Sequence, residues 1–394
     1  MMKAGAGKAR IELPPELFPI ETFRTVAAPL HLRALLLEDE AGARAALVSY
    51  ELTSLRGYAV AAAKATVQAL TGIPAERIWV CVSHTFSAPH TRSENAMSAA
   101  DAALRHKNEL LCQALDQALR TAVQAAAGAM QAAQMRGGAA QCQFNCNRDL
   151  EGPDGWWHGP DTRGCSDHEI PLVRFDRLDG TPLALFYACD VQSSLTENTG
   201  VVSSDLLGCA SLWAEEHCPG LVAVGAVGTA GDQMPAPGTA LQALGQTLGQ
   251  ALLAARLDAS APACTLAGAE KAISVAGQKP PMDMRMLHPD RCYRYQPDAD
   301  RTTLIKALTL GDVAVVGVKP ELNSTTGHTI RQTSPYRRTL VLTMVDGGEK
   351  YMADSRSYER CTYEAMNSQF GQGSAEQLAQ AIHTLLQQCK GGKA

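Results

Sequence analysis

The chain has 394 residues, of which 46% are hydrophobic, 19% charged and 5% aromatic, and its formal net charge is −5. This composition is typical of a globular protein with ample material for a core. The net negative charge and the absence of a long run of either charge argue against a nucleic-acid partner. The N-terminus lacks the apolar core of a secretory signal, and no stretch approaches the roughly 18 apolar residues that span a bilayer. We therefore expect a cytoplasmic protein without stable membrane insertion.

Apolar runs that alternate with helical periodicity predict an α/β fold. The expected strands cover residues 4–11, 30–39, 43–52, 79–82, 139–147, 170–176, 182–189, 221–227, 313–318 and 338–345. The expected helices cover residues 55–71, 99–133, 204–216, 239–256 and 375–388. No Pro/Ser-rich or charge-rich linker divides the chain, which favours one large domain over residues 1–394.

Two stretches lack clear periodicity and are expected to be loops. Residues 148–165 are rich in Gly and Trp, and such a long loop is often a lid or a binding loop. Trp156 and Trp157 either cap a pocket or pack on the core. Residues 280–300 read as an exposed loop.

The twelve cysteines are scattered along the chain, and most read as reduced, buried hydrophobic residues. One group invites comparison with a zinc site and consists of Cys142, Cys146, His158 and Cys165. Its spacing fits no common structural zinc motif.

Four polar residues each follow an apolar run with strand character, namely His84, Asp190, Glu321 and Tyr351. If these runs share a sheet, the four side chains can converge at one rim. They would supply one nitrogen and three oxygens to a divalent metal. The spacing alone does not establish that they converge.

A set of short motifs runs in order along the chain. It comprises AGAGKARIELPP, HTFSAP, the pair Asn147-Arg148, ACDVQSS, SSDLLGCA, GTAGDQMP, KPELN, YMADSRSYERCTYEA and NSQFGQGSAEQL. Taken together, these motifs resemble those of the neutral, non-lysosomal ceramidase family along nearly the whole length. The resemblance implies mixed β-sheets flanked by helices and a zinc-dependent amidase site. An immunoglobulin-like C-terminal domain commonly follows in that family and is expected to be absent here.

Five positions match functional residues of the family. His84, Glu321 and Tyr351 stand at metal-ligand positions. Arg148 and Tyr363 stand at positions that stabilise the transition state.

Three other positions depart from the family. Phe86 replaces the second histidine of an HTH motif, Asp190 replaces a histidine ligand, and Met234 replaces the nucleophilic serine. A thioether cannot attack a carbonyl, which excludes a mechanism that uses this position. The loss of one oxyanion donor at Phe86 would cost about 3 kcal/mol, and His90 is a candidate to replace it.

A carboxylate ligand at Asp190 makes a metal site harder and less positive than an imidazole would. Zinc remains the first candidate, with manganese, iron and magnesium as alternatives.

The first hypothesis is therefore a metal-dependent hydrolase of a small amide or ester, with metal-bound water as the nucleophile. Asp232 or Asp205 would act as general base, and Arg148 with Tyr363 would bind the oxyanion. The partner would be a small-molecule substrate other than ceramide.

Two alternatives stay open. The first is a catalytically inactive, ceramidase-like binding protein. The second is a cysteine enzyme that uses Cys189, although the neighbouring Asp190 would raise the pKa of that thiol.

Overall fold

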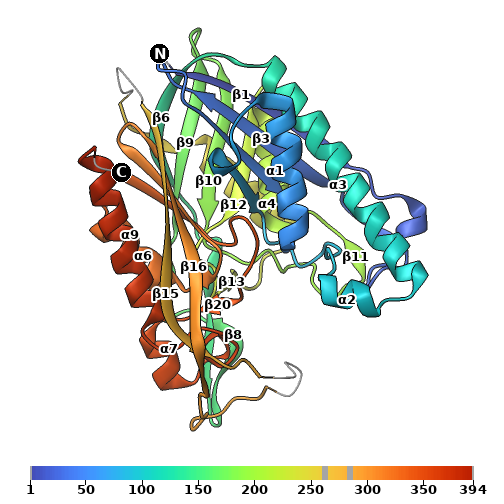
Figure 1. The fold of residues 1–394 in the computed structure, drawn as a ribbon, viewed down its shortest axis with the longest axis vertical. Helices are drawn as coiled ribbons and strands as arrows, with labels where there is room; N and C mark the ends of the chain where they lie inside the picture. Colours follow the sequence, from blue (N-terminus) through green and yellow to red (C-terminus); the bar gives the residue numbers. More distant parts are fainter. Residues whose placement is uncertain (1, 260–264, 282–286, 393–394) are drawn as a thin grey trace.

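A large mixed sheet forms the middle of the molecule (Figure 1). The structure is a computed structural model that describes residues 2–259, 265–281 and 287–392, and within them this sheet has nine strands. They are β1 Lys3–Ile11, β3 Leu30–Glu38, β4 Arg44–Tyr50, β5 Ile78–Val82, β6 Gln131–Gln141, β9 Glu169–Arg177, β10 Pro182–Cys189, β12 Val222–Val227 and β14 Arg256–Leu257. Their order is β12-β10-β9-β6-β1-β3-β4-β5, and β14 pairs with β6.

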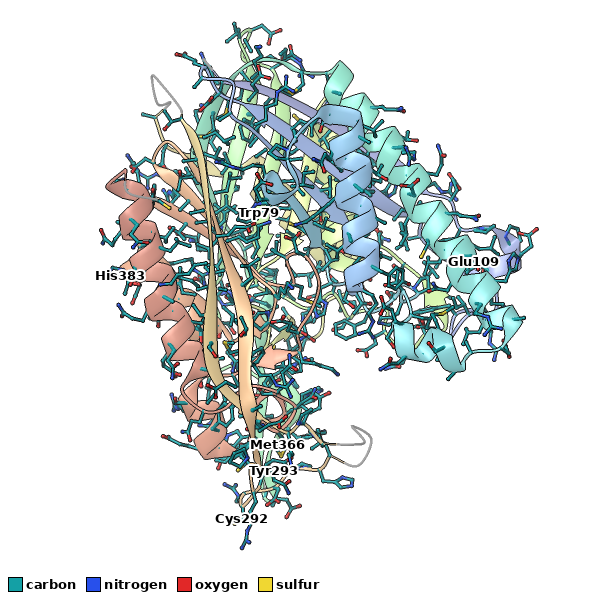
Figure 2. The ribbon with its side chains drawn as sticks, viewed as in Figure 1. Trp79, Glu109, Cys292, Tyr293, Met366 and His383 are labelled. Carbon is teal, nitrogen blue, oxygen red and sulfur yellow. The ribbon has the colours of Figure 1, made fainter. Side chains whose placement is uncertain are left out.

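A second sheet packs on one face of the first and consists of β15 Leu266–Gln278, β16 Pro297–Leu310, β17 Val313–Val318 and β19 Arg338–Leu342. Alternate residues of the strands point into the space between the sheets, as the period of two requires. Leu35 and Phe186 of the large sheet share one core there with Val315 and Leu340. Trp79 is buried in the same core (Figure 2).

Helices cover the outer faces of both sheets, which gives four layers (Figure 1). The large sheet carries α1 Gly57–Thr71, α3 Ala102–Gly128, α4 Asp205–His217 and α5 Leu241–Leu253. The second sheet carries α6 Ser324–Thr333 and α9 Ser374–Lys390. Leu378, Ile382 and Leu385 of α9 recur at helical spacing and are buried.

Short elements fill the space beyond the ends of the large strands. Small sheets are formed by β13 Gln233–Pro235 with β7 Asn145–Gly152 and β8 Gly155–Asp161, by β18 Glu321–Leu322 with β20 Tyr351–Met352, and by β2 Thr25–Val26 with β11 Val201–Val202. The short helices are η1 Pro15–Leu17, η2 Ala75–Arg77, α2 Glu94–Ala99, α7 Ser355–Arg360 and α8 Tyr363–Met366.

The predicted fold class, mixed sheets flanked by helices, is confirmed. Three local predictions were wrong. The expected helix 99–133 ends at Gly128, and β6 begins at Gln131. The stretch 148–165, expected as an irregular loop, lies largely in the hairpin β7–β8. Part of the expected loop 280–300 belongs to β16, and its residues 282–286 lie outside the described chain.

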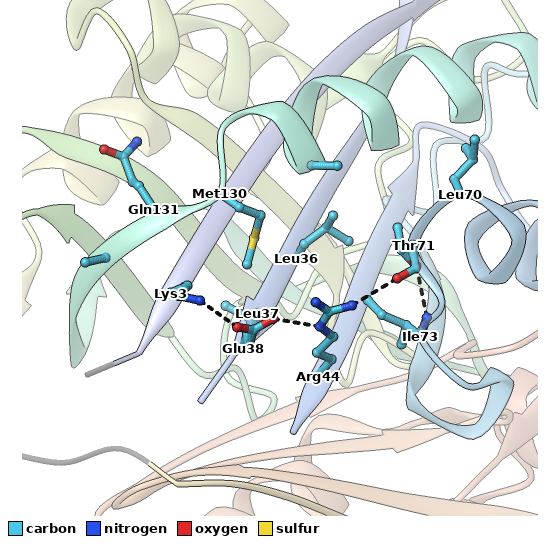
Figure 3. Close-up of a pocket in the computed structure, with 12 residues that line it drawn as sticks. Lys3, Leu36, Leu37, Glu38, Arg44, Leu70, Thr71, Ile73, Met130 and Gln131 are labelled. Atoms are coloured by element: carbon cyan, nitrogen blue, oxygen red, sulfur yellow. Dashed lines mark hydrogen bonds and ion pairs between the residues drawn. The ribbon is translucent and has the colours of Figure 1, made fainter. Parts of the chain in front are cut away.

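A cavity of about 470 Å³ opens where strands β1, β3 and β4 meet the ends of α1 and α3 (Figure 3). Leu36 and Met130 form part of its lining. Lys3 and Arg44 both bond to Glu38, at 2.8 and 2.7 Å, so a single carboxylate is shared by two positive charges at this cavity. Among the helices in the described ranges, none is long and apolar enough to span a membrane.

Glycines in β1 let the backbone of α3 approach the sheet closely. A Cβ at Gly7 would lie 2.2 Å from the Ala122 carbonyl oxygen. We expect Gly7→Ala to lower the free energy of unfolding by about 1–3 kcal/mol, because backbone atoms must move to make room. The matched control is Gly57→Ala, where a Cβ would meet nothing within 4 Å. Urea unfolding measures both, and equal effects at the two positions would contradict this packing.

Candidate active site

Glu321 and Tyr351 are held side by side by backbone pairing. Each begins a two-residue strand, and the two residues are direct partners in the parallel register of β18 with β20. Both side chains are buried. Two short strands beyond the end of β17 therefore bring together two residues that are 30 positions apart in the sequence.

His84 joins this pair from the end of β5. Its Nδ1 lies 2.7 Å from the Thr53 carbonyl oxygen, so Nδ1 donates and Nε2 carries the lone pair. That Nε2 lies 3.2 Å from Glu321 Oε2. Two buried acceptors facing each other require a cation between them, either a proton or a metal ion. His84 has a φ of +59°, a left-handed conformation that turns the chain sharply at the end of the strand.

Arg148 of β7 forms the centre of the cluster and is almost fully buried. Its Nε and Nη2 donate to Glu364 Oε1 at 3.0 and 2.7 Å. Nη1 donates to Gln192 Oε1 at 2.5 Å, and Nη2 donates to the Tyr351 hydroxyl at 3.1 Å. These bonds use four of the five guanidinium N–H groups, which leaves one Nη1 hydrogen without a partner among the described residues.

Gln192, which the sequence analysis missed, occupies the place expected for Asp190. Its Nε2 donates to Glu321 Oε2 at 3.2 Å while its Oε1 faces Arg148. The neighbouring Ser193 pairs with Thr85, and this bridge carries Gln192 to the His84 segment. An amide side chain has no pattern in sequence that marks it as functional.

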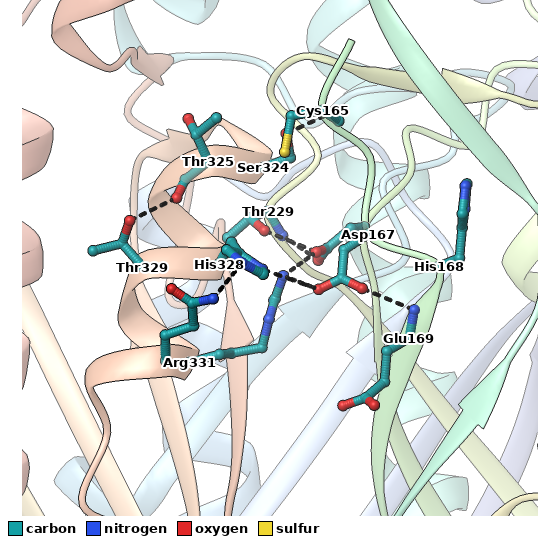
Figure 4. A network of polar contacts seen from close by, with 12 residues as sticks. Cys165, Asp167, His168, Glu169, Thr229, Ser324, Thr325, His328, Thr329 and Arg331 are labelled. Carbon is teal, nitrogen blue, oxygen red and sulfur yellow. Dashed lines mark hydrogen bonds and ion pairs between the residues drawn. The ribbon is translucent and has the colours of Figure 1, made fainter. Parts of the chain in front are cut away.

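Asp190 does not reach the cluster, so the predicted convergence of four side chains was wrong on this point. Its carboxylate accepts hydrogen bonds from the Thr229 amide and hydroxyl at 2.7 and 2.9 Å, and from Arg331 at 2.9 Å. Arg331 also bonds to Asp167 (Figure 4). Asp190 thus fixes the turn after β12. In the described ranges, no group of three or more His, Cys, Asp or Glu side chains is arranged to hold a metal ion, so a site at His84 and Glu321 would need a ligand of another kind.

Tyr363 begins α8 and lies beside Arg148, whose guanidinium carbon is 5.8 Å from the centre of the Tyr363 ring. Trp157 and His158 of β8 contact the same ring, with centroids 5.1 and 4.2 Å away. Loss of hydration and the charge of Arg148 lower the pKa of His158 to about 4. His158 is therefore a neutral wall of the site at physiological pH.

Tyr351 and Tyr363 both keep their protons at neutral pH. Burial is the main cause that raises the pKa of each hydroxyl, and the charge of Glu321 adds to it. The Tyr363 hydroxyl makes no hydrogen bond within the described part of the chain. It is a donor without a partner in the described residues, on a ring whose centre lies 5.8 Å from the Arg148 guanidinium carbon.

Three other predicted residues do not direct their side chains to the facing pair of His84 and Glu321, although the Asp232 carbonyl oxygen accepts from the Arg148 amide at 2.9 Å. His90 bonds to Glu21 at 2.9 Å and is 40% exposed in its side chain. Asp205 accepts from the Leu195, Thr196 and Leu206 amides, a loop-fixing role. Asp232 accepts from the amide and hydroxyl of Ser324, the first residue of α6, at 2.8 and 2.9 Å.

The structure shows the surroundings of Phe86 and Met234, which replace residues of the family, and of Cys189. Phe86 packs edge-on against His84, with ring centroids 4.8 Å apart. Met234 lies in β13 opposite Cys146 of β7. Burial and the charge of Asp190 raise the pKa of Cys189 well above its ordinary value, which keeps that thiol protonated and poorly nucleophilic.

Glu197 is a second residue that sequence reasoning missed. It lies in the exposed loop after Gln192, and its charge acts on Tyr363. Loss of hydration raises the pKa of Glu197, while the charges of Arg148 and His84 lower it. No apolar run precedes Glu197, so the rule that found His84 and Glu321 passes over it.

His84, Glu321 and Tyr351 are the residues that would hold a divalent metal. An imidazole nitrogen and a carboxylate oxygen lie 3.2 Å apart, and Tyr351 is the backbone register partner of Glu321. Imidazole and carboxylate are ordinary zinc ligands, whereas the Tyr351 phenol keeps its proton and accepts a hydrogen bond from Arg148.

The fold of the chain is that of the neutral ceramidases. A solved structure titled "Ceramidase complexed with C2" matches 98% of this chain and 74% of its own, with a TM-score of 0.75 and 15% identity. The neutral ceramidase from Pseudomonas aeruginosa matches 98% and 73%, with a TM-score of 0.73 and 16% identity. Neither a comparison with family models nor one with curated proteins finds a match. The resemblance seen in the motifs is thus confirmed for the fold.

We expect Asp190 to couple energetically to Arg331 and not to His84. Removing one partner of a buried ion pair costs about 3–5 kcal/mol, so Asp190→Asn should be strongly destabilising. A double-mutant cycle of Asp190→Asn with Arg331→Met should give a coupling of about 1 kcal/mol or more. The cycle of Asp190→Asn with His84→Gln, measured by the same denaturant unfolding, should be additive. Coupling of Asp190 to His84 and not to Arg331 would contradict this arrangement and would place Asp190 in the cluster around Arg148.

Asp232 makes stability depend on pH. Burial raises its pKa from 3.8 to about 7, so the folded chain keeps a proton that the unfolded chain releases above pH ~4. The stabilisation from this group is complete below pH ~4 and is lost as pH rises to about 7, by roughly 4 kcal/mol. We expect the unfolding free energy of the wild type to fall relative to that of Asp232→Asn as pH rises over this range. A difference that stays constant from pH 4 to 8 would contradict the raised pKa.

Proposed function

We propose that the chain is a hydrolase of an amide or ester bond in a small substrate, with its active site at the cluster around Arg148. His84, Glu321 and Tyr351 would hold a divalent metal, zinc first among the candidates. When bound, such an ion supplies Lewis acidity to the site.

The observation that carries the proposal is a pair of unused donors, on Arg148 and Tyr363, in a cluster that Gln192 links to Glu321 and so to His84. Arg148 has one free N–H, and the Tyr363 hydroxyl has no partner in the described chain. Buried donors fixed in place before the reaction stabilise an oxyanion as it forms on a carbonyl oxygen. Arg148 cannot swing away, because Glu364 and Gln192 hold its other nitrogens.

Glu197 is better placed as general base than Asp232 or Asp205. Its loop lies within electrostatic range of His84 and Arg148. The carboxylate oxygens of the two aspartates are already engaged by backbone and hydroxyl donors. Asp232 also has a raised pKa, but both of its carboxylate oxygens accept hydrogen bonds, whereas the Glu197 carboxylate accepts none among the described residues.

We expect Tyr363→Phe to lower kcat by about 10²–10³-fold, the usual effect of losing one oxyanion donor. Stability should not change, because the hydroxyl has no partner to lose. The assay uses p-nitroanilide and p-nitrophenyl ester substrates, with and without a chelator. The matched control is Tyr293→Phe, because the Tyr293 ring contacts Tyr295 at 5.0 Å and not Arg148. Turnover that is unchanged both in Tyr363→Phe and after complete chelation would contradict the proposal.

The second candidate is a catalytically inactive binding protein. It is favoured by Gln192, whose neutral amide links Arg148 to Glu321, and by Met234 at the serine position of the family. In that case a proton lies between His84 and Glu321. The wild type would then hydrolyse neither the p-nitroanilide nor the p-nitrophenyl ester, whichever metal is added.

A further inference from the structure

Two buried carboxyl groups stand beside Arg148, those of Asp149 and Glu364. Glu364 of α8 is fully buried, and Asp149 of β7 is 8% exposed. Glu364 Oε1 accepts from Arg148 Nε and Nη2 at 3.0 and 2.7 Å, which accounts for one of its two oxygens. Neither carboxyl group has a role in the oxyanion stabilisation proposed for Arg148 and Tyr363.

The pair requires a shared proton. Asp149 Oδ1 and Glu364 Oε2 are buried, and neither accepts a hydrogen bond from an N–H or O–H group outside the pair in the described structure. The two side chains hydrogen-bond to each other. Because an ionised carboxylate can only accept, a hydrogen bond between two carboxyl groups forms only when one of them is protonated.

The charges around the pair place this proton on Asp149. Burial and the charge of Glu364 raise the pKa of Asp149 well above its ordinary value, and the charge of Asp232 adds to this. Burial alone would also raise the pKa of Glu364, but the charge of Arg148 lowers it. His158, the nearest register partner of Asp149 in β8, is neutral at physiological pH and supplies no second cation.

The other charged side chains that face Asp149 offset one another. Asp149 lines a polar cavity between the β7–β8 hairpin and α7. Besides Asp149 and Asp232, three acidic and three basic residues of the described chain line it, namely Glu151, Asp161, Asp354, Arg163, Arg356 and Arg360. Among the described residues, Arg148 is therefore the cation that decides which carboxyl group of the pair is ionised.

A single negative charge in a fixed position holds Arg148 in one orientation. Both bonds from Arg148 go to the same oxygen of Glu364, so that oxygen fixes the Nε–Nη2 edge of the guanidinium. Because the guanidinium is planar, a fixed edge also fixes the direction of the remaining Nη1 hydrogen. The hydrogen bond from Asp149 opposes rotation of the Glu364 carboxyl group, which would break the bonds to Arg148.

We propose that Asp149 is a positioning residue of the candidate active site: the proton it shares with Glu364 leaves one fixed negative charge, which orients Arg148 towards the substrate carbonyl. This role rests on the proposed function, in which Arg148 is an oxyanion donor. Loss of the proton would leave two facing carboxylates, which repel each other and displace Glu364.

Two substitutions of Asp149 separate positioning from packing. Asp149→Leu removes the donor to Glu364 and should lower kcat about tenfold or more, because a small displacement of Arg148 weakens its contact in the transition state. KM should change less, since the contact is made to the oxyanion. Asp149→Asn should restore most of kcat, because its amide N–H donates to Glu364 as the protonated carboxyl group does. The substrate is whichever of the p-nitroanilide and the p-nitrophenyl ester the wild type hydrolyses.

The pH profile of kcat is a readout that a purely structural role would not change. Wild-type kcat should fall as pH rises from about 6 to about 10, because Asp149 loses its proton. Asp149→Asn should lack this fall, since an amide does not ionise. Asp232, with a pKa of about 7, also titrates in this range, but it is present in both proteins and cancels in the comparison.

Infrared difference spectroscopy detects the shared proton without a substrate. A protonated carboxyl group has a C=O stretch distinct from that of a carboxylate, and the spectrum of wild type minus Asp149→Asn at neutral pH should contain it. The matched control is Glu151→Gln, because Glu151 lies on the same hairpin and cavity wall but pairs with Arg291 at 3.1 Å. This control should change neither the band nor kcat.

A melting curve shows whether each variant is folded, and Asp149→Asn alone decides the question if Asp149→Leu does not fold. A difference spectrum without the protonated carboxyl band, or the same pH profile in wild type and Asp149→Asn, would overturn the positioning role. A wild type that shows the band but hydrolyses neither substrate would contradict the proposed function and leave Asp149 as a structural partner of Glu364 only.

Discussion

The buried positive charge of Arg148 is the constraint on which the candidate site depends. A guanidinium taken out of water must find acceptors for its N–H groups, or the fold loses several kcal/mol. Here Glu364, Gln192 and the Tyr351 hydroxyl supply them, each from a different segment of the chain. The same bonds that satisfy the charge draw these segments to one point. Stability and site geometry therefore share a single cause.

The ion pair of Arg148 also explains the carboxyl pair behind it. Glu364 gives Oε1 to Arg148, and its side chain also shares a hydrogen bond with the buried carboxyl group of Asp149. Arg148 holds the pKa of Glu364 down, while burial and Glu364 hold that of Asp149 up, so one proton rests on Asp149.

Much of the fold could be predicted from sequence, because apolar runs of period 2 and 3.6 mark buried strands and helices directly. The hairpin β7–β8 could not, since its Trp- and Gly-rich residues are only partly buried and show no clean alternation. At the site, the strand-end rule found His84 and Glu321. It failed for Asp190, because a side chain at a strand end can equally fix the neighbouring turn, as it does here through Thr229.

The central claim is that His84, Glu321 and Tyr351 hold a metal ion, and elemental analysis of protein purified without chelator tests it most directly. The matched variants are His84→Ala and Glu321→Gln, which remove one donor each from the facing pair. Wild-type protein should contain close to one metal ion per chain, which zinc restores after stripping and which both variants lose. Wild-type protein that takes up no zinc, manganese, iron or magnesium would contradict it and leave a proton between His84 and Glu321.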